Sequence, residues 1–455
     1  MADDQLYIVA TASIVVLLFA WQVVSRRFDP FAPVWMFLVG YLQVYVVQAT
    51  TLRDWALTIR GVDVVSAANV RSLWALLWFL VVYYSGIGKV VARAFPNPPG
   101  AWSLPVVGML SPVLAALGFY SAWMVMTQLA GEASASPEAA LLYSFPFLSN
   151  VAAILLIVSG RRPGAPRPLL LAAGLGVASA YILLWMYLGK RAPALIGVLA
   201  SVCAFYVARR SRPSWPVLMA TAFAGSLFVA LAIGWRNNVN YERSATGFVE
   251  YLGDFRVASI LKSLNVDDDE ESQDPSKYIS QESLEYGGFL LMLDTVPAKS
   301  EYDYGANYIR CFSTFIPRLV WPDKPLYGRD KWVAAWIAGS EMKRDEDFAG
   351  PAIGILGATQ LNGGAVGTMI VLAVVAVGQR AGYEYYRRHD AVPWVQAWWA
   401  LIFYTAWFAV VNDDPANWFY YNWGFTCLPV LAILWMVNKF LPAPLAAGTL
   451  ATRAD

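Results

Sequence analysis

Histidine and cysteine are scarce in this sequence. Its 455 residues include one histidine, His389, and three scattered cysteines, Cys203, Cys311 and Cys427. Such an odd and scattered set gives neither a disulfide framework nor a zinc-ligand spacing. No cluster of Asp, His and Cys has the spacing of a metal site either. The sequence therefore predicts a protein without structural disulfides, without a bound metal ion and without a cofactor.

Charged residues are also few. They make up 14% of the chain, whereas 58% of its residues are hydrophobic. Soluble domains carry about 25% charged residues. The apolar residues come in runs of about 17–25, the length that crosses a bilayer core. A formal net charge of +1 gives no reason to expect nucleic acid as a partner. These features exclude an ordinary soluble domain and predict an all-α polytopic integral membrane protein.

The apolar runs predict about 11 transmembrane helices and one large helical extracytoplasmic loop. The expected spans are residues 6–24, 31–50, 71–88, 104–130, 141–159, 168–188, 192–208, 216–234, 350–378, 394–411 and 424–438. Residues 235–349 are too long for an ordinary connection, which indicates a functional loop. The predicted organisation is therefore eight helices in residues 1–234, the loop in 235–349, three helices in 350–440 and a tail in 441–455.

Basic residues follow every odd-numbered span. They are Arg26, Arg27, Lys89, Arg93, Arg161, Arg162, Arg167, Arg209, Arg210, Arg212, Arg380, Arg387, Arg388 and Lys439. Short basic loops stay in the cytoplasm during insertion. We therefore expect the N-terminus and the large loop outside the membrane and the C-terminus in the cytoplasm. His389, in "YRRHDAV", then lies on the cytoplasmic side.

Several stretches of the large loop have apolar residues at helical spacing. They are "ATGFVEYLGDFRVASILKSL" (245–264), "SLEYGGFLLMLDTVP" (283–297), "YGANYIRCFSTF" (304–315) and "DKWVAAWIAGSEM" (330–342). The five consecutive acids from Asp267 to Glu271 do not have the spacing of a calcium-binding loop. Such a run is typical of a solvated surface segment. We therefore expect a loop of several helices with an exposed acidic stretch.

The stretch "FIPRLVWPDKP" (315–325) is unusual in so apolar a chain. Its three prolines fix backbone angles and reduce the entropy of the free loop. Arg310 lies just before it, Arg318 and Lys324 lie within it, and Trp321 offers a flat apolar face. Cations held beside aromatic faces bind phosphates, and sugars stack nearby. The alternative interpretation is a re-entry turn anchored at the lipid headgroups by tryptophan and arginine.

A second basic site is expected on the same side of the membrane. The short connection "GKRAP" (189–193) places Lys190 and Arg191 outside. Two cations at a helix end are also typical of side chains that only extend to the membrane surface. Both interpretations stay open for this pair.

The Pro-Arg-Trp-Pro-Lys-Pro stretch, preceded by "YGANYIRCFSTF", resembles the "fiPR-x-x-Wp-x-KP" signature of bacterial oligosaccharide repeat-unit polymerases. These are the Wzy-type O-antigen and exopolysaccharide polymerases. Downstream, "GILGATQLNGGAVG" (354–367) is similar to that family's small-residue stretch with an asparagine before glycines. "GKRAP" is similar to its basic residue at an outer helix end. Arg236 and Gly247 have the spacing of an Arg-x10-Gly motif found in one branch. The resemblance covers roughly residues 189–367.

The resemblance implies glycosyl transfer on the outer face of a bacterial plasma membrane. A polyprenyl-diphosphate-linked glycan is the donor, and a hydroxyl of another lipid-linked repeat unit attacks its anomeric carbon. Membrane lipid and a chain-length regulator protein are the other expected partners. Cations must stabilise the leaving diphosphate, because no metal site is visible. The candidates are Arg236, Arg310, Arg318, Lys190, Arg191 and Lys324, with Trp321 and Asp323 beside them as glycan-binding residues.

A base for the incoming hydroxyl is less defined. Related O-antigen ligases place a histidine in the outer loop, but His389 is expected on the wrong side of the membrane. A base would therefore be a carboxylate. Asp414, with its neighbour Asp413 in "VVNDDPANWFYYNW", is one candidate, and Glu250, Asp254 and Glu285 are others. The paired aspartates are alternatively a solvated cap on span ten.

Other function classes remain open. An O-antigen ligase or a lipid-phosphosugar glycosyltransferase has the same architecture but acts once. The latter class uses an acidic residue or pair in its first outer loop, expected here at "TLRDWALTIRGVD" (51–63), where Asp54 and Asp63 are isolated. A transporter or flippase of lipid-linked glycans would show internal repeats and intramembrane charges. The sequence shows no repeat and few charges within its spans, which favours the enzyme over the transporter and over a purely structural membrane partner.

Overall fold

The computed structural model of the chain describes residues 3–98, 103–129, 145–163, 166–237, 241–242, 244–254, 284–313, 316, 320–324, 334, 337, 352–411 and 428–440. In these residues every regular element is a helix. Eight helices are long and apolar enough to cross a membrane: Gln5–Val24, Pro33–Thr51, Arg53–Tyr84, Leu104–Met124, Pro168–Tyr187, Trp215–Ala232, Gly354–Arg388 and Pro393–Val411. The expectation of an all-α polytopic membrane protein is confirmed.

The eight helices overlap eight of the eleven expected spans. Two further expected spans fall on shorter apolar helices, α8 (Phe147–Gly160) and α10 (Arg191–Val207). The last expected span overlaps α22 (Leu428–Phe440). The total of eleven, the sidedness of the termini and the identity of the membrane stay predictions.

The chain forms two compact units, each described here by itself. Unit 1 comprises Met1–Pro96, Gln273–Arg388 and Phe403–Gly424, and unit 2 comprises Asn97–Ser272, His389–Ile402 and Phe425–Asp455. The second part of the predicted large loop thus packs with the first spans of the chain. The units follow tertiary packing, whereas the predicted segments followed chain order.

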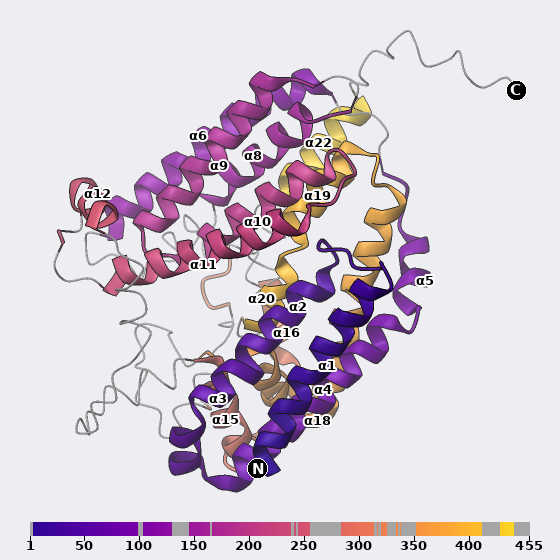
Figure 1. The fold of residues 1–455 in the computed structure, drawn as a ribbon, viewed down its shortest axis with the longest axis vertical. Helices are drawn as coiled ribbons and strands as arrows, with labels where there is room; N and C mark the ends of the chain where they lie inside the picture. The colour runs from indigo at the N-terminus through magenta and orange to yellow at the C-terminus, as the bar shows by residue number, and fades with distance from the viewer. Residues whose placement is uncertain are drawn as a thin grey trace, which may run out of the picture. The chain divides into compact units, whose positions relative to one another are not determined.

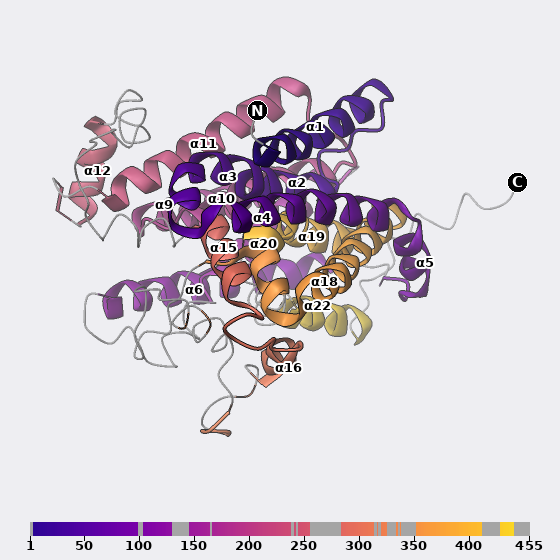
Figure 2. The ribbon, with the colours of Figure 1, turned by 90° about the horizontal axis from the view of Figure 1, so that it is seen from below.

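Unit 1 is a bundle around three helices, α4, α15 and α18. Helix α4 packs against α1 and α15, and α18 packs against α4, α5 and α15, while α2 packs against α20 (Figures 1 and 2). Large aromatic side chains fill its core, where the Phe37 and Phe79 rings stack with centroids 3.7 Å apart. The bounds are α1 Asp3–Val24, α2 Pro33–Leu42, α4 Arg53–Tyr84, α5 Ile87–Ala94, α15 Glu285–Thr295, α18 Gly354–Arg388 and α20 Thr405–Val411.

Two of these central helices are broken by glycines. The expected first outer loop at 51–63 is largely helical, because residues from Arg53 onward belong to α4, which is interrupted at Gly61 with φ 80° and ψ 164°. Its position outside the membrane stays a prediction. Helix α18 is interrupted at Gly363 and Gly364, and Gly364 has φ 60° and ψ −137°. Positive φ is readily available to glycine and strained for other residues. The two glycines of "LNGG" therefore permit an interruption of α18. The pattern of apolar residues, which continues through this stretch, gave no sign of it.

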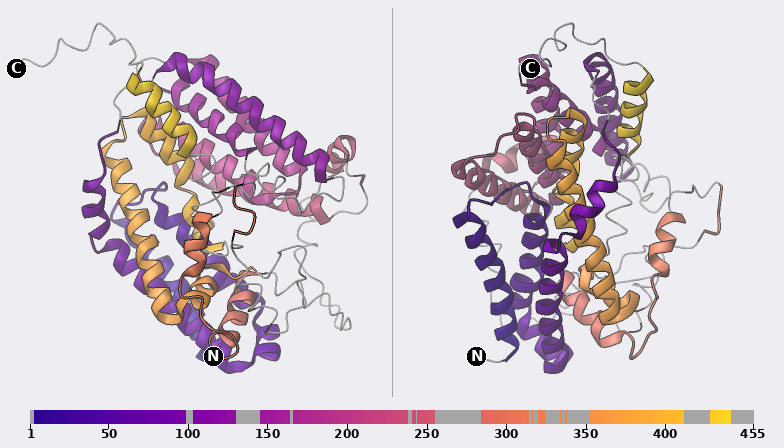
Figure 3. Two further views of the ribbon diagram at one scale, coloured as in Figure 1. Left: turned by 180° about the vertical axis from the view of Figure 1, so that it is seen from behind. Right: turned by 90° about the vertical axis from the view of Figure 1, so that its right-hand side faces the viewer.

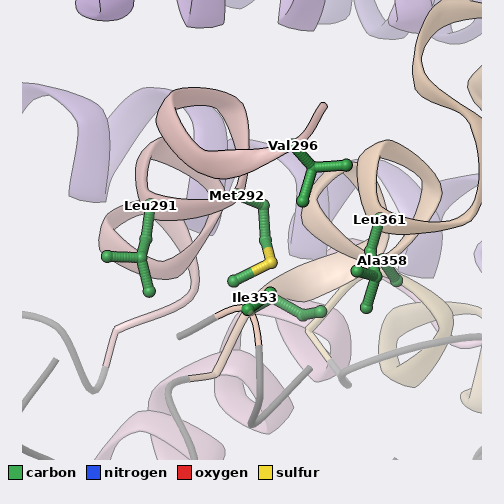
Figure 4. Packing of buried hydrophobic residues seen from close by; sticks show 7 residues of the cluster. Leu291, Met292, Val296, Ile353, Ala358 and Leu361 are labelled. Atoms are coloured by element: carbon green, nitrogen blue, oxygen red, sulfur yellow. The ribbon is translucent and has the colours of Figure 1, made fainter. Parts of the chain in front are cut away.

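Helix α15 confirms the helix predicted in "SLEYGGFLLMLDTVP", but it lies deep in the bundle. Figure 4 shows Met292 and Val296 facing Ile353, Ala358 and Leu361, at the start of α18. Gly288 allows this approach, because a Cβ atom there would lie 2.0 Å from the Ala352 carbonyl oxygen. This part of the predicted outer loop is therefore a core element of unit 1.

Unit 2 is a bundle of continuous apolar helices around α8. Helix α8 packs against α6, α9, α10 and α19, and α11 packs against α9 and α10 (Figures 1 and 3). Every residue of α8 after Phe147 is buried. Glycines allow close approach of its neighbours, since a Cβ at Gly160 would lie 2.4 Å from the Leu171 amide nitrogen. The remaining bounds are α6 Leu104–Leu129, α9 Pro168–Tyr187, α11 Trp215–Asn237, α12 Ala245–Asp254 and α19 Pro393–Ile402.

Candidate functional site

The proline-rich motif begins at the end of helix α16 (Ala306–Ser313), which confirms the helix predicted there. Lys324 Nζ donates hydrogen bonds to the carbonyl oxygens of Ile316, at 2.8 Å, and Ser313, at 3.4 Å. Carbonyl groups at a helix C-terminus lack intrahelical partners, and a lysine nearby can satisfy them. Lys324 therefore connects the described part of the motif to the end of α16. Trp321 and Asp323 are exposed in this part, and Arg318 lies outside the described residues.

Arg310 is held in place by an aspartate that sequence reasoning did not select. Arg310 Nη1 lies 3.0 Å from Asp303 Oδ1, and the Asp303 side chain is only 5% exposed. The other Asp303 oxygen accepts the Asn307 backbone N–H in the first turn of α16. The Asp303 backbone N–H donates to the Leu361 carbonyl at 2.9 Å. Asp303 thus connects the helix that precedes the motif to the segment of α18 just before its break.

The break in α18 has its own polar contacts. Thr359 and Thr368, on the two sides of the break, share a hydrogen bond of 2.9 Å between their hydroxyl groups. Thr368 also donates to the Gly364 carbonyl at 2.9 Å. Asn362 is 6% exposed, and its Nδ2 donates to the Ala358 carbonyl at 2.7 Å. These bonds satisfy part of the backbone that the break exposes and keep the two halves of the helix in register.

A cation from α4 approaches the same segment of α18. Arg71 Nη1 donates to Gln360 Oε1. Gln360 is 3% exposed, and its Nε2 donates to the Val296 carbonyl that follows α15. Sequence reasoning missed Arg71, although it lies within a helix otherwise apolar enough to cross a membrane. An ionisable residue in such a helix is a functional candidate by default, and that signal was available.

A further pair of cations shares one carboxylate at the end of α15. Asp294 Oδ2 lies 2.8 Å from Lys299 Nζ and 3.6 Å from Arg60 Nη1. The Arg60 side chain is only 9% exposed. We define the cation cluster as Arg60, Arg71, Lys299 and Arg310 with the carboxylates Asp294 and Asp303. The ion pairs named above give these four cations two carboxylate partners, and Arg71 is in none of them, which suits the cluster to bind oxyanions.

Unit 2 gathers a separate set of predicted cations. Trp235 Nε1, in the last turn of α11, donates to the Tyr187 carbonyl at the end of α9 at 2.7 Å. Trp235 packs in one cluster with Trp185 of α9 and Ala194 of α10. Exposed Lys190 precedes α10 and exposed Arg191 is its first residue. Arg236 follows Trp235, and its side chain is not described. The helix ends that carry all three residues therefore meet.

The candidate bases differ in their surroundings. Glu285 Oε2 accepts a hydrogen bond of 2.6 Å from Gln48 Nε2, in the π-helix η1 (Gln43–Gln48). Asp254 Oδ2 accepts one of 2.9 Å from the Tyr241 hydroxyl, and this bond raises the pKa of Tyr241. Glu250 is exposed on α12. Asp413 and Asp414 lie outside the described residues, so their role stays a prediction.

In the part of the chain that the structure describes, no group of three or more His, Cys, Asp or Glu side chains could hold a metal ion. The chain was also compared with known proteins. No protein-family model matches it, and neither a curated protein nor a solved structure does.

Proposed function

We propose that the chain is a membrane glycosyltransferase that polymerises polyprenyl-diphosphate-linked oligosaccharide repeat units into a surface polysaccharide. The observation that supports it is the junction of two sequence motifs at the cation cluster. The helix before the proline-rich motif carries Arg310, which Asp303 ties to the backbone of "LNGG" in α18. Both stretches resemble the repeat-unit polymerases, and they lie far apart in the sequence.

The cations supply what this transfer needs at the leaving group. In the proposed step, a hydroxyl oxygen of one lipid-linked repeat unit bonds to the anomeric carbon of another. The bond from that carbon to the diphosphate oxygen breaks, and the diphosphate keeps the electron pair. Arg310 and Arg318 stabilise the negative charge that develops there, because a guanidinium matches phosphate oxygens with two parallel hydrogen bonds. A carboxylate accepts the hydroxyl proton.

Fixed geometry makes Arg310 suitable for this role. Its guanidinium is held through a buried carboxylate, and its side chain is 29% exposed. An arginine has five N–H donors, so it can serve more than one partner. A preorganised cation costs no reorganisation when charge develops on the substrate.

A transporter or flippase of lipid-linked glycans is the second candidate, favoured by a specific observation. Broken helices and cations within membrane helices are typical of transporters. The interruption at Gly363–Gly364 and the position of Arg71 both have this character. A ligase that transfers a finished glycan once has the same chemical needs as the polymerase.

The decisive experiment replaces Arg318 in a cell whose surface polysaccharide depends on this chain. We expect Arg318→Ala to abolish chain extension at a normal amount of membrane protein. Arg318→Lys should also extend chains poorly, because an ammonium cannot form the bidentate contact. The matched control is Arg162→Ala. Arg162 is an exposed cation of unit 2 that belongs neither to the cation cluster nor to the group of Lys190, Arg191 and Arg236.

The glycan products separate the three functions. Loss of a polymerase leaves single repeat units on the outer face. Loss of a ligase leaves long polymer on the lipid carrier, and loss of a flippase leaves no glycan outside. Full-length polymer from Arg318→Ala at normal expression would mean that the motif is only a structural turn.

A further inference from the structure

Arg71 carries a charge that its surroundings do not neutralise. It is partly buried in α4, and its hydrogen-bond partner, Gln360, is uncharged. Within the described residues Arg71 takes part in no ion pair, whereas Asp294 pairs with Arg60 and Lys299, and Asp303 pairs with Arg310. A partly buried cation without a counter-charge destabilises the fold unless it binds an anion. Arg71 therefore has a positive charge available to a ligand.

Gln360 orients this guanidinium without reducing its charge. Because Gln360 Nε2 donates to the Val296 carbonyl, its Oε1 faces Arg71. That acceptor uses one guanidinium nitrogen, and the planar group offers five N–H donors in total. The remaining donors can meet the paired oxygens of a phosphate group. A buried amide is thus a positioning residue for Arg71.

Tyr302 supplies a second donor beside Arg71. Its neighbour Asp303 donates its backbone N–H to the carbonyl of Leu361, which follows Gln360, the partner of Arg71. Tyr302 itself packs partly buried against the α15–α18 cluster. Its hydroxyl approaches the break in α18 so closely that a Cβ at Gly364 would lie 2.7 Å away. None of the hydrogen bonds found among the described residues uses this hydroxyl. Gly364 therefore makes room for a tyrosine hydroxyl at the same place as the unneutralised arginine.

We propose that Arg71 and Tyr302, at the break of α18, bind the phosphate group of a phosphate-bearing lipid. The helices themselves favour a lipid over a soluble anion. Val366 and Ile370, directly after the break, are 66% and 59% exposed, and Val70 is exposed beside Arg71. Apolar side chains exposed on helices of membrane-spanning length contact acyl or prenyl chains. Naming a polyprenyl diphosphate as this lipid rests on the proposed function, whereas phosphate binding does not.

The test measures affinity for a fluorescent analogue of farnesyl diphosphate, using the full-length protein in neutral detergent micelles. We expect Tyr302→Phe, which removes only the hydroxyl, to weaken binding about tenfold, the effect of losing one hydrogen bond to a charged group. Arg71→Gln should weaken it about a hundredfold. Arg53→Gln is the matched control, because Arg53 is a cation of the same helix paired with Asp54. Its affinity should equal that of the wild type.

Competition then identifies the source of the phosphate. Displacement by unlabelled farnesyl diphosphate but not by phosphatidylglycerol supports a prenyl diphosphate ligand. Equal displacement by both supports the same site with a bilayer headgroup as its ligand. If Arg71→Gln does not yield folded protein, Tyr302→Phe decides the outcome. Unchanged affinity of folded Tyr302→Phe, with Arg71→Gln unchanged where it folds, would overturn the proposal.

The binding assay tests the phosphate site, and polymer formation tests the proposed function, so either proposal can be refuted without the other. A chain that binds the analogue through Arg71 but forms no polymer refutes the proposed function and leaves the phosphate site standing. A chain that polymerises glycans normally with Arg71→Gln and Tyr302→Phe refutes a role of this site in the reaction. The two proposals are therefore separated by one binding assay and one gel.

Discussion

Units 1 and 2 are both apolar helical bundles, but they place their charges differently. Unit 1 holds ion pairs within its bundle: the Asp303 and Arg60 side chains are 5% and 9% exposed, and Arg380 and Glu384 of α18 are 14% and 13% exposed. The Arg210–Asp390 pair of unit 2 is 55% and 30% exposed. Two central helices of unit 1, α4 and α18, are broken, whereas α8 of unit 2 is continuous and buried.

Under the proposed function, this difference favours unit 1 as the place of the cations that act on the diphosphate. Burying a charge and breaking a helix both cost stability, so they persist where the remaining structure compensates and often mark functional sites. Helix α8 of unit 2 has the opposite character, because small and aliphatic residues pack densely along it. For stability, we therefore expect substitutions of buried charges to matter most in unit 1 and substitutions of volume to matter most around α8 in unit 2.

The largest expected effect is on the buried ion pair of unit 1. Asp303→Ala should destabilise the protein by about 3 kcal/mol, because it removes the buried carboxylate that pairs with Arg310 and the acceptor at the start of α16. Asp390→Ala in unit 2 removes an exposed pair and should cost less than about 1 kcal/mol. Thermal unfolding in detergent compares the two variants directly. Equal losses of stability would contradict the contrast between the units.

The next prediction compares two glycines of helix α9 to test the packing of unit 2, and its expected change in stability is smaller. A Cβ at Gly174 of α9 would lie 2.8 Å from the Ile157 amide nitrogen, whereas a Cβ at Gly176 meets nothing within 4 Å. Gly174→Ala should therefore destabilise by about 1–3 kcal/mol through overpacking. Gly176→Ala should stabilise by about 0.5–1 kcal/mol, since alanine favours a helix. Unfolding curves of both variants give the difference, and a loss with Gly176→Ala would show that the packing is misassigned.

The smallest expected effect is none at all. The proposed reaction uses arginine and lysine side chains at the leaving diphosphate, so chelation with EDTA should leave polymer formation unchanged. The measurement is glycan length on a gel from washed membranes with and without EDTA. Loss of activity that a divalent ion restores would mean that acids outside the described residues, such as Asp267 or Asp413, hold a metal.

Much of the architecture was predictable from the sequence. Runs of apolar residues locate most of the helices, and the helical spacing in "SLEYGGFLLMLDTVP" and "YGANYIRCFSTF" predicts α15 and α16. The burial of α15 within unit 1 was not predictable. Its composition gives no sign that Gly288 packs closely against the backbone of Ala352, just before α18. The helical conformation of "TLRDWALTIRGVD" was not predicted, because its charges gave no sign of a helix that is interrupted at a glycine.

The candidate site was predictable only in part. Arg310 and Lys324 could be selected because they flank a proline-rich motif. Asp303 and Gln360 could not, since a single polar residue in a loop or an apolar helix gives no sign of its distant partner. Arg71 carried a usable signal, a lone charge in an apolar run. Long-range contacts such as Arg71–Gln360 depend on tertiary packing, which periodicity does not encode.

Helix α8 has a consequence for the biogenesis of the protein. Its 14 residues span about 21 Å, which is shorter than the ~30 Å hydrocarbon core of a bilayer. A lone span of this length would have to thin the membrane around it. Surrounded by α6, α9, α10 and α19, it does not need to match the lipid. We therefore expect α8 to enter the membrane as a hairpin with α9, and its final position to be reached only after later-synthesised α19 has joined the bundle.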